Sequence, residues 1–277
     1  MTSATPSSTT KEQILLNDEQ MVDFIINGYT IVETDFGDEF NQGVFDQLEA
    51  LPENPGDGIL EAVPALGDVY SHPKVAGALA SVLGPDYYMY QHRHCHRNMP
   101  GTPSQMWHLD GGAGTTERNP EHVRAVLAMY YPQDVESNMG PTALIPGTHL
   151  FPSSADRMAS YGNFKNQIIA TVKAGSVLII HYDVWHAGTA NTSDNVRYMI
   201  KFLFNRLSDT TKPSWDYDRD AAAALGEKIT SASGAPVTRA LAGIEKNRRI
   251  KMWNNLAGGT TFPSEYWDRW KGPWPAR

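Results

Sequence analysis

The chain has 277 residues and a net charge of −8, with 41% hydrophobic and 19% charged residues. This is the composition of a globular protein large enough to bury a sizeable core, and its acidic balance makes nucleic acid or an anionic membrane a poor main partner. The single cysteine, Cys95, excludes an intrachain disulfide and favours a reducing, cytoplasmic compartment. We expect Cys95 to be a semi-buried strand residue and not a nucleophile.

The chain begins with a segment that is typical of a disordered tail. Residues 1–12 are rich in Ser and Thr and lack the apolar stretch of a secretory signal. No run of the sequence approaches 18 apolar residues, so we expect no membrane span. Residues 13–277 are expected to form a single domain.

The first third of that domain is predicted to be mainly helical. A helix with Asn17 or Asp18 as its N-cap ends at Gly28, and the alternating segment "YTIVETDF" follows as a strand. Residues 38–51 are predicted to be helical, and 52–68, rich in Gly and Pro, to be a loop. The segment "HPKVAGALASVLG" is a further short helix.

From residue 86 onward the pattern becomes mostly β. The candidate strands lie in "YYMYQHRHCHRN", "HVRAVLAMYYPQ", "TALIPG", "QIIATVKAGSVLIIHYDVWHAGTAN" and "VRYMIKFLFNRL", separated by turn residues as in a sandwich or barrel. The last 70 residues are predicted to be helical and end in a cluster of tryptophans. We expect this extension to pack on the β core; the alternative is that its tryptophans cover a homodimer interface. They are Trp253, Trp267, Trp270 and Trp274.

The segment "QMWHLD" carries His108 and Asp110, two positions apart. In an extended chain such residues point to the same side, so one face would present an imidazole and a carboxylate. The pair can supply two ligands to a metal. It also occurs by chance at solvated strand ends, so the pair alone does not decide.

A third candidate ligand, His186, lies at the end of an apolar strand, and Arg197 follows the turn "ANTSDN". With the turn centred near residues 191–192, positions 186 and 197 are predicted to be opposite each other in an antiparallel hairpin and to share a face. A guanidinium in an apolar strand needs a partner or a ligand, and its planar fork suits a carboxylate. The alternative is a structural salt bridge with Asp183 or Asp194.

Two histidines and one carboxylate form the facial triad of non-haem Fe(II) oxygenases, which leaves three coordination positions open. A 2-oxo acid can take two of these positions and dioxygen the third. Arg197 would then supply a cation for the far carboxylate of 2-oxoglutarate.

Other histidines compete for the distal ligand position. His181 is five residues before His186 and therefore falls on the opposite face of a regular strand. His149, in "PGTH", is predicted to be a loop residue. The alternating His92, His94 and His96 could form a separate metal site, although a half-exposed polar sheet face is the favoured interpretation.

Three segments, "QMWHLD", "MGPTALIPGTH" and "WHAGTANTSDNVRYMIKF", resemble the phytanoyl-CoA dioxygenase family of Fe(II)/2-oxoglutarate oxygenases. With the first helix and the "GYTIVE" strand, the resemblance covers roughly residues 17–206. It implies a mainly β fold, a cupin-like double-stranded β-helix or jelly roll with the metal at one mouth. The β core is then expected at about 86–206, with flanking N-terminal helices and the helical, Trp-rich extension at about 207–277.

The resemblance also implies residue roles. His108, Asp110 and His186 would be the iron ligands, and Arg197 would bind the C5 carboxylate of 2-oxoglutarate. Where some relatives carry a hydroxyl residue two positions after the distal histidine, this chain has Gly188. Trp107 and Trp185 are expected to pack beside the ligands. Further co-substrate contacts are expected from Gln105, Thr142, Thr189 and either Arg93 or Gln91.

The predicted function is that of an Fe(II)/2-oxoglutarate-dependent dioxygenase that hydroxylates an unactivated C–H bond of a small metabolite, such as a secondary-metabolite scaffold. It would use dioxygen, convert 2-oxoglutarate to succinate and carbon dioxide, and take ascorbate as a supporting reductant; desaturation or ring formation are alternative outcomes. An acyl-CoA is disfavoured because basic residues cluster only in "EKNRRIK". Tyr88, Tyr90 and Tyr130 are expected to line the cavity. A cupin-like metal isomerase or hydrolase and a catalytically inactive binding protein of the same fold remain as alternatives.

Overall fold

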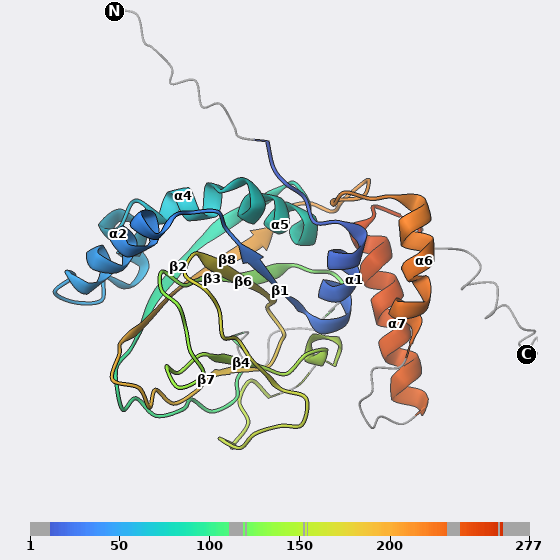
Figure 1. Ribbon diagram of the computed structural model, residues 1–277. Coiled ribbons are helices and arrows are strands. Elements are labelled where there is room, and N and C mark those ends of the chain that lie inside the picture. The colour runs from blue at the N-terminus through green and yellow to red at the C-terminus, as the bar shows by residue number, and fades with distance from the viewer. Residues whose placement is uncertain are drawn as a thin grey trace, which may run out of the picture.

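Two antiparallel sheets face each other and form the centre of the molecule (Figure 1). The computed structural model describes residues 12–110, 119, 121–151, 153, 155–231, 239–259 and 261–262. Within these residues one sheet has five strands in the order β1-β6-β3-β8-β2, and the other has three in the order β5-β4-β7. The predicted jelly roll is therefore confirmed. The strands are β1 (Tyr29–Glu33), β2 (Tyr87–Asn98), β3 (Ala125–Tyr130), β4 (Thr142–Leu144), β5 (Ile168–Ile169), β6 (Ser176–His181), β7 (His186–Gly188) and β8 (Arg197–Arg206).

Helices from the N-terminal part of the chain cover the outer face of the five-stranded sheet (Figure 1). The first helix starts and stops as predicted: Asn17 and Gln20 form a capping box, and Gly28 ends it with a φ of 79°. Residues 52–68 are not the plain loop that was predicted, because this stretch contains a 3-10 turn, one short helix and the start of another. The helices here are α1 (Asp18–Asn27), α2 (Asp38–Glu49), η1 (Gly56–Gly58), α3 (Ile59–Ala62), α4 (Leu66–Ser71) and α5 (Pro73–Leu83).

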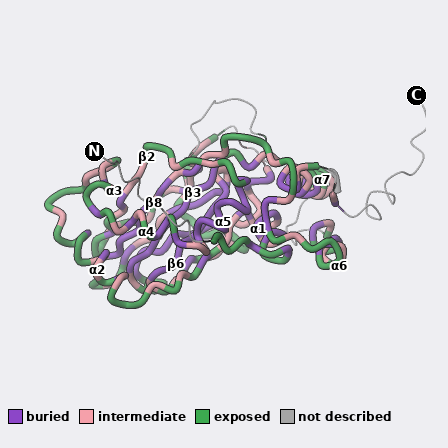
Figure 2. Tube along the Cα trace, turned by 90° about the horizontal axis from the view of Figure 1, so that it is seen from above, coloured by how far each residue is buried: buried purple, intermediate pink, exposed green. Residues whose placement is uncertain are grey.

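Alternating side chains of the central strands divide the interior into two cores. Strand β3 is buried along its whole length. Its residues Val126 and Ala128 pack towards the helices, whereas Leu127 and Met129 point into the space between the sheets. Buried segments accordingly run through β3, β6 and α5 (Figure 2). Because the period of a strand is two, the residues that share the face of Met129 are the ones that can reach a site between the sheets.

The C-terminal extension packs beside α1 and not on the open face of a sheet. Its helices α6 (Arg219–Thr230) and α7 (Arg239–Leu256) contact α1 and each other (Figure 1). Trp253 is fully buried, with its ring 4.9 Å from that of Trp215 in an edge-on arrangement. It is therefore unavailable for a dimer interface. Trp267, Trp270 and Trp274 lie outside the described residues, as do positions 1–11 of the predicted tail. None of the helices in the described part of the chain is both long and apolar enough to cross a membrane.

We expect Trp253→Ala to lower the free energy of unfolding by about 3–5 kcal/mol, because it removes a large aromatic ring from a packed core. Ile244→Ala on the same helix, where the side chain is 43% exposed, should change the stability by no more than about 0.5 kcal/mol. Equilibrium urea unfolding of both variants measures the difference. If both substitutions changed the free energy of unfolding by the same small amount, the C-terminal extension would contribute little to the stability of the domain.

Candidate metal centre and co-substrate pocket

Backbone pairing brings the two segments that carry the predicted ligands together. His108 and His186 exchange two backbone hydrogen bonds of 3.0 Å, so an isolated bridge joins the "HLD" segment to the first residue of β7. The two imidazole rings lie side by side, with centroids 4.4 Å apart. In this way a local sheet contact places residues 78 positions apart in the sequence at one point.

Each imidazole is held through the same nitrogen. Nδ1 of His108 lies 2.9 Å from the carbonyl oxygen of Met106, and Nδ1 of His186 lies 3.0 Å from that of Val184. A carbonyl oxygen only accepts, so both Nδ1 atoms carry the proton and both Nε2 atoms present a lone pair. Burial lowers the pKa of His186 to about 4, which keeps this ring neutral. A neutral imidazole with its other nitrogen bound to a carbonyl is the form that ligates metals.

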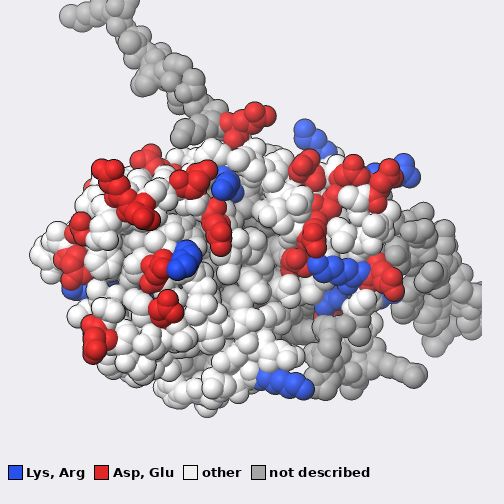
Figure 3. Space-filling view, viewed as in Figure 1, with Lys and Arg blue, Asp and Glu red and all other residues white. Residues whose placement is uncertain are grey.

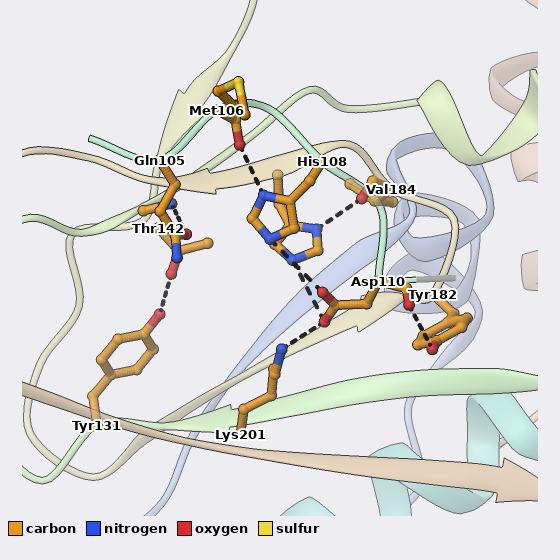
Figure 4. Close-up of polar contacts among 11 residues, drawn as sticks. Gln105, Met106, His108, Asp110, Tyr131, Thr142, Tyr182, Val184 and Lys201 are labelled. Atoms are coloured by element: carbon orange, nitrogen blue, oxygen red, sulfur yellow. Dashed lines mark hydrogen bonds and ion pairs between the residues drawn. The ribbon is translucent and has the colours of Figure 1, made fainter. Parts of the chain in front are cut away.

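The Asp110 carboxylate faces both rings (Figure 4). Its Oδ1 lies 3.7 Å from Nε2 of His108 and its Oδ2 lies 3.8 Å from Nε2 of His186. Burial acts to raise the pKa of Asp110, but the electrostatic interaction with the His186 ring, the positive charge of Lys201 and a hydrogen bond from Lys201 bring it down to about 2. The group is therefore an anion at neutral pH.

These three side chains fit a metal ion. One ligand atom from each of His108, Asp110 and His186 lies within 4.8 Å of the others, and they form the one such cluster among the described residues. Two nitrogens and one carboxylate oxygen on one side of an ion match the facial triad of non-haem iron centres. The sequence prediction of this cluster agrees with the geometry.

A cavity of about 280 Å³ opens beside the triad between the two sheets. His108, His186 and Arg197 all line it. Arg197 is only 3% exposed and forms no ion pair with any residue that the structure describes. Its Nη2 donates to the carbonyl oxygen of Gly140, while Nε and Nη1 find no hydrogen-bond partner in the described part of the chain. The alternative of a salt bridge with Asp183 or Asp194 is therefore wrong.

Arg197 reaches this cavity by a route that differs from the prediction. His186 is in β7 of the small sheet and Arg197 is in β8 of the large one, so the two are not opposite each other in a hairpin. Instead Arg197 pairs with Asn98 of β2. The segment between the strands crosses from one sheet to the other, and the buried Asn191 fixes it with hydrogen bonds to the carbonyl oxygens of Asn98 and Asn195. The two side chains meet because the sheets face each other.

Gln105, Thr142 and Thr189 also line the cavity. Thr142 shares a 2.9 Å hydrogen bond with the hydroxyl of Tyr131. The backbone N–H of Gly188 donates to Oε1 of Gln105 at 2.8 Å. A Cβ at position 188 would lie 3.1 Å from that oxygen, so the glycine leaves room for the glutamine side chain. Gln105 thus occupies the space beside Gly188 that a side chain at that position would need.

Arg93 does not line the cavity. It pairs with Glu61 at 3.1 Å, and its backbone N–H donates to Asp57. In β2 positions 94–98 line the cavity, whereas Arg93 is outside the lining and opposes Phe202, which belongs to the core beneath the helices. Arg93 is therefore not a co-substrate contact in this structure, and Gln91 is exposed and also outside the lining.

The expected aromatic lining is wrong as well. Tyr88 and Tyr90 are more than 40% exposed. The hydroxyl of Tyr130 donates to Asn41 in the helical layer. The wall of the cavity instead carries polar and sulfur-containing side chains. They are His94, His96, Met129, Met199 and Lys201.

The competing histidines fall into two groups. His94 and His96 line the cavity, and burial lowers the pKa of both imidazoles, that of His96 to about 2. His92 does not line the cavity, and its Nδ1 lies 3.3 Å from Oδ1 of Asp57. They form no metal-binding cluster among the described residues. His181 and His149 pack against each other away from the triad, with ring centroids 5.0 Å apart. His149 is fully buried and lies in a 3-10 turn, Thr148–Leu150, where a plain loop was predicted.

Lys201 is a site residue that the sequence reasoning missed. Its Nζ lies 2.6 Å from Oδ2 of Asp110, and the side chain is 12% exposed (Figure 4). It is four residues after Arg197 in the same strand, so the two share a face. Cys95, in contrast, is 4% exposed, and burial raises the pKa of its thiol to about 11, which is consistent with a packing role. Trp107 and Trp185 pack beside the ligands as expected.

A two-histidine, one-carboxylate cluster at the mouth of a jelly roll defines the class of non-haem iron oxygenases. The family model described as phytanoyl-CoA dioxygenase (PhyH) matches residues 33–199, which is more than half of the chain. The chain belongs to the phytanoyl-CoA dioxygenase family, and it is a 2-oxoglutarate-dependent non-haem iron dioxygenase by class.

Individual relatives are distant. An ectoine dioxygenase of Bordetella bronchiseptica is 22% identical over 246 residues, which cover 72% of this chain and 78% of the relative. The apo structure of HygX from Streptomyces hygroscopicus has a TM-score of 0.58 at 16% identity and covers 72% of this chain and 89% of its own. The epimerase SnoN from nogalamycin biosynthesis has a TM-score of 0.56 at 16% identity, with coverages of 68% and 82%. These structural similarities establish the shared fold.

Proposed function

We propose that this protein hydroxylates an unactivated C–H bond of a small metabolite and converts 2-oxoglutarate to succinate and carbon dioxide in the same cycle. The proposal rests on Arg197, a buried guanidinium that lines the same cavity as the triad and has no ion-pair partner among the described residues. A buried cation is costly unless an anion neutralises it. A dicarboxylate that reaches from the triad to Arg197 supplies that anion.

In this proposal His108, Asp110 and His186 hold Fe(II), and Arg197 binds the far carboxylate of 2-oxoglutarate. When bound, the iron supplies the site for activating dioxygen. The structure of HygX with nickel and 2-oxoglutarate, and that of SnoN with Fe3+ and alpha-ketoglutarate, support this pairing of ligands on the fold. Ascorbate is proposed only as an external reductant that keeps the iron reduced.

The remaining polar groups are proposed to orient the co-substrate. Thr142 is 3% exposed, and its hydroxyl is fixed by Tyr131, so it can offer a hydrogen bond at little entropic cost. Gln105 is held against the backbone of Gly188 and directs its amide into the cavity lining. Buried Trp107 and Trp185 beside the ligand segments exclude water from the back of the site.

The size and charge of the site favour a small substrate over an acyl-CoA. The cavity of about 280 Å³ is at or below the lower end of ordinary small-molecule sites. Acidic side chains predominate on the face shown in Figure 3, which offers no broad basic area for CoA phosphates. Relatives named for small metabolites support this class: an ectoine dioxygenase, and HygX in a complex with hygromycin B.

The testing experiment is a metabolite screen for substrate-stimulated succinate release by the purified, iron-loaded protein. We expect a subset of small metabolites to raise succinate formation and to gain one oxygen atom, measured by mass spectrometry. Turnover of a metabolite without 2-oxoglutarate would favour a cupin-like isomerase or hydrolase. Binding of metal and metabolite without any turnover would favour an inactive binding protein.

A further inference from the structure

Lys201 contacts the metal-binding carboxylate directly, which none of the assigned roles explains. Its Nζ donates to Oδ2 of Asp110 at 2.6 Å, and no other acceptor contacts it among the described residues. The side chain comes from the centre of β8, where Lys201 is paired with His94 on one side and Met129 on the other. It is thus fixed to the large sheet, whereas the ligand segment is paired with the small one.

Both oxygens of Asp110 are placed to reach one ion. Oδ1 lies near Nε2 of His108 and Oδ2 near Nε2 of His186, at almost equal distances of 3.7 and 3.8 Å. Carboxylates bind metals through either one or two oxygens. The geometry of the triad alone therefore does not prevent Asp110 from occupying two coordination positions.

The number of positions that Asp110 takes decides what else can bind. An octahedral ion with two imidazoles and one carboxylate oxygen keeps three open positions, enough for a bidentate 2-oxoglutarate and dioxygen. A second carboxylate oxygen removes one of the three. A 2.6 Å charge-assisted hydrogen bond makes Oδ2 a poorer donor to the metal.

Two further contacts limit the freedom of Asp110. The hydroxyl of Tyr182 donates to its main-chain carbonyl oxygen at 3.0 Å (Figure 4). The adjacent Leu109 is buried with Trp107 and Trp185. With the backbone held on one side and Oδ2 held by Lys201 on the other, the carboxylate has one free oxygen to direct at the ion.

We propose that Lys201 is a positioning residue that restricts Asp110 to one-oxygen ligation and so preserves the coordination position needed by the co-substrate. The inference rests on the proposed function. It assigns to Lys201 an effect on 2-oxoglutarate binding that is larger than its effect on metal binding. If Lys201 only neutralised Asp110 in the metal-free protein, its removal would change the metal affinity and leave the 2-oxoglutarate affinity unchanged. The bound metal ion would then neutralise Asp110 in place of the lysine.

The experiment compares Lys201→Met, Lys201→Arg and the control Lys173→Met. Lys173 pairs with Asp134 at the same 2.6 Å distance, but on the surface. Co(II) titration gives the metal affinity, and its visible spectrum reports the coordination number. Anaerobic titration of the Fe(II) protein with 2-oxoglutarate, followed by the charge-transfer absorption band, gives the co-substrate affinity. The 2-oxoglutarate titration uses metal-loaded protein, in which the ion itself neutralises Asp110 if the lysine is absent.

We expect Lys201→Met to bind Co(II) at least as tightly as the wild type and to bind 2-oxoglutarate about tenfold more weakly, a change of about 1.4 kcal/mol. Lys201→Arg should restore 2-oxoglutarate binding, and Lys173→Met should match the wild type. Unchanged 2-oxoglutarate affinity and an unchanged Co(II) spectrum in Lys201→Met would overturn the role of Lys201 alone. A wild-type protein without the charge-transfer band would instead refute the proposed function.

Discussion

Replacing Arg197 with methionine is expected to raise the KM for 2-oxoglutarate by about thirtyfold or more while leaving iron affinity nearly unchanged. Removing one partner of a buried, hydrogen-bonded charge pair costs about 2–5 kcal/mol of binding, and each 1.4 kcal/mol is about a factor of ten. Iron affinity should be spared because the hydrogen bond that the Arg197 side chain donates goes to the carbonyl oxygen of Gly140 and not to a ligand. Steady-state succinate formation and metal titration measure the two quantities.

Arg93→Met is the matched control for Arg197→Met. Arg93 is also a strand arginine, but it pairs with Glu61 outside the cavity, so the KM for 2-oxoglutarate should stay at the wild-type value. Stability gives a second check. Without co-substrate, the free energy of unfolding of Arg197→Met should equal or exceed that of the wild type, because the variant removes a buried charge that has no counter-ion among the residues described. A large loss of stability together with an unchanged KM would assign Arg197 a structural role.

Removal of a triad ligand is expected to weaken iron binding strongly and to abolish succinate formation. His186→Ala should weaken Fe(II) binding by more than about a hundredfold, since even changes to residues behind a ligand cost 10–100-fold in metal affinity. Succinate formation should fall to background, because no iron remains to activate dioxygen. Metal content after dialysis and Fe(II) titration under anaerobic conditions measure the affinity.

His92→Ala controls for removal of a histidine in general. This side chain is 58% exposed, lies beside Asp57 and takes no part in the metal cluster. Metal content and activity should equal those of the wild type. Retention of stoichiometric iron by His186→Ala would exclude the assigned triad. Loss of iron in His92→Ala would indicate that the histidines of β2 bind the metal.

The ligands could be found from sequence because their positions follow from local rules. His108 and Asp110 are two residues apart, which places them on one side of an extended segment in any fold. His186 was predicted to lie at the end of an apolar strand, but that strand, β6, ends at His181, and His186 is the first residue of β7 in the small sheet. The N-terminal helix was equally predictable, because its capping box and its terminal Gly28 are local signals.

The same local rules could not predict how the chain between His186 and Arg197 crosses from one sheet to the other. A turn-like segment between two apolar strands indicates a hairpin, yet the chain here crosses from the small sheet to the large one. The buried Asn191 that fixes this crossing acts through hydrogen bonds to residues in other segments. Pairing between sheets is a tertiary property, and sequence periodicity describes only one strand at a time.

The alternation of side chains along β8 and β2 is sufficient to predict which of their residues face the cavity. Once Arg197 is assigned to the cavity face, the alternation of β8 puts Met199 and Lys201 on that face as well. The same rule applied to β2 separates His94 and His96 from Arg93. What periodicity could not predict is the contact between Lys201 and Asp110, since it joins a residue of the large sheet to the segment paired with the small sheet.

The most direct test is an anaerobic crystal structure of the protein with Fe(II) and 2-oxoglutarate. We predict one iron ion bound by Nε2 of His108, Nε2 of His186 and a single oxygen of Asp110, with the far carboxylate of 2-oxoglutarate against the guanidinium of Arg197. Iron bound elsewhere, or a co-substrate whose far carboxylate is turned away from Arg197, would contradict the account.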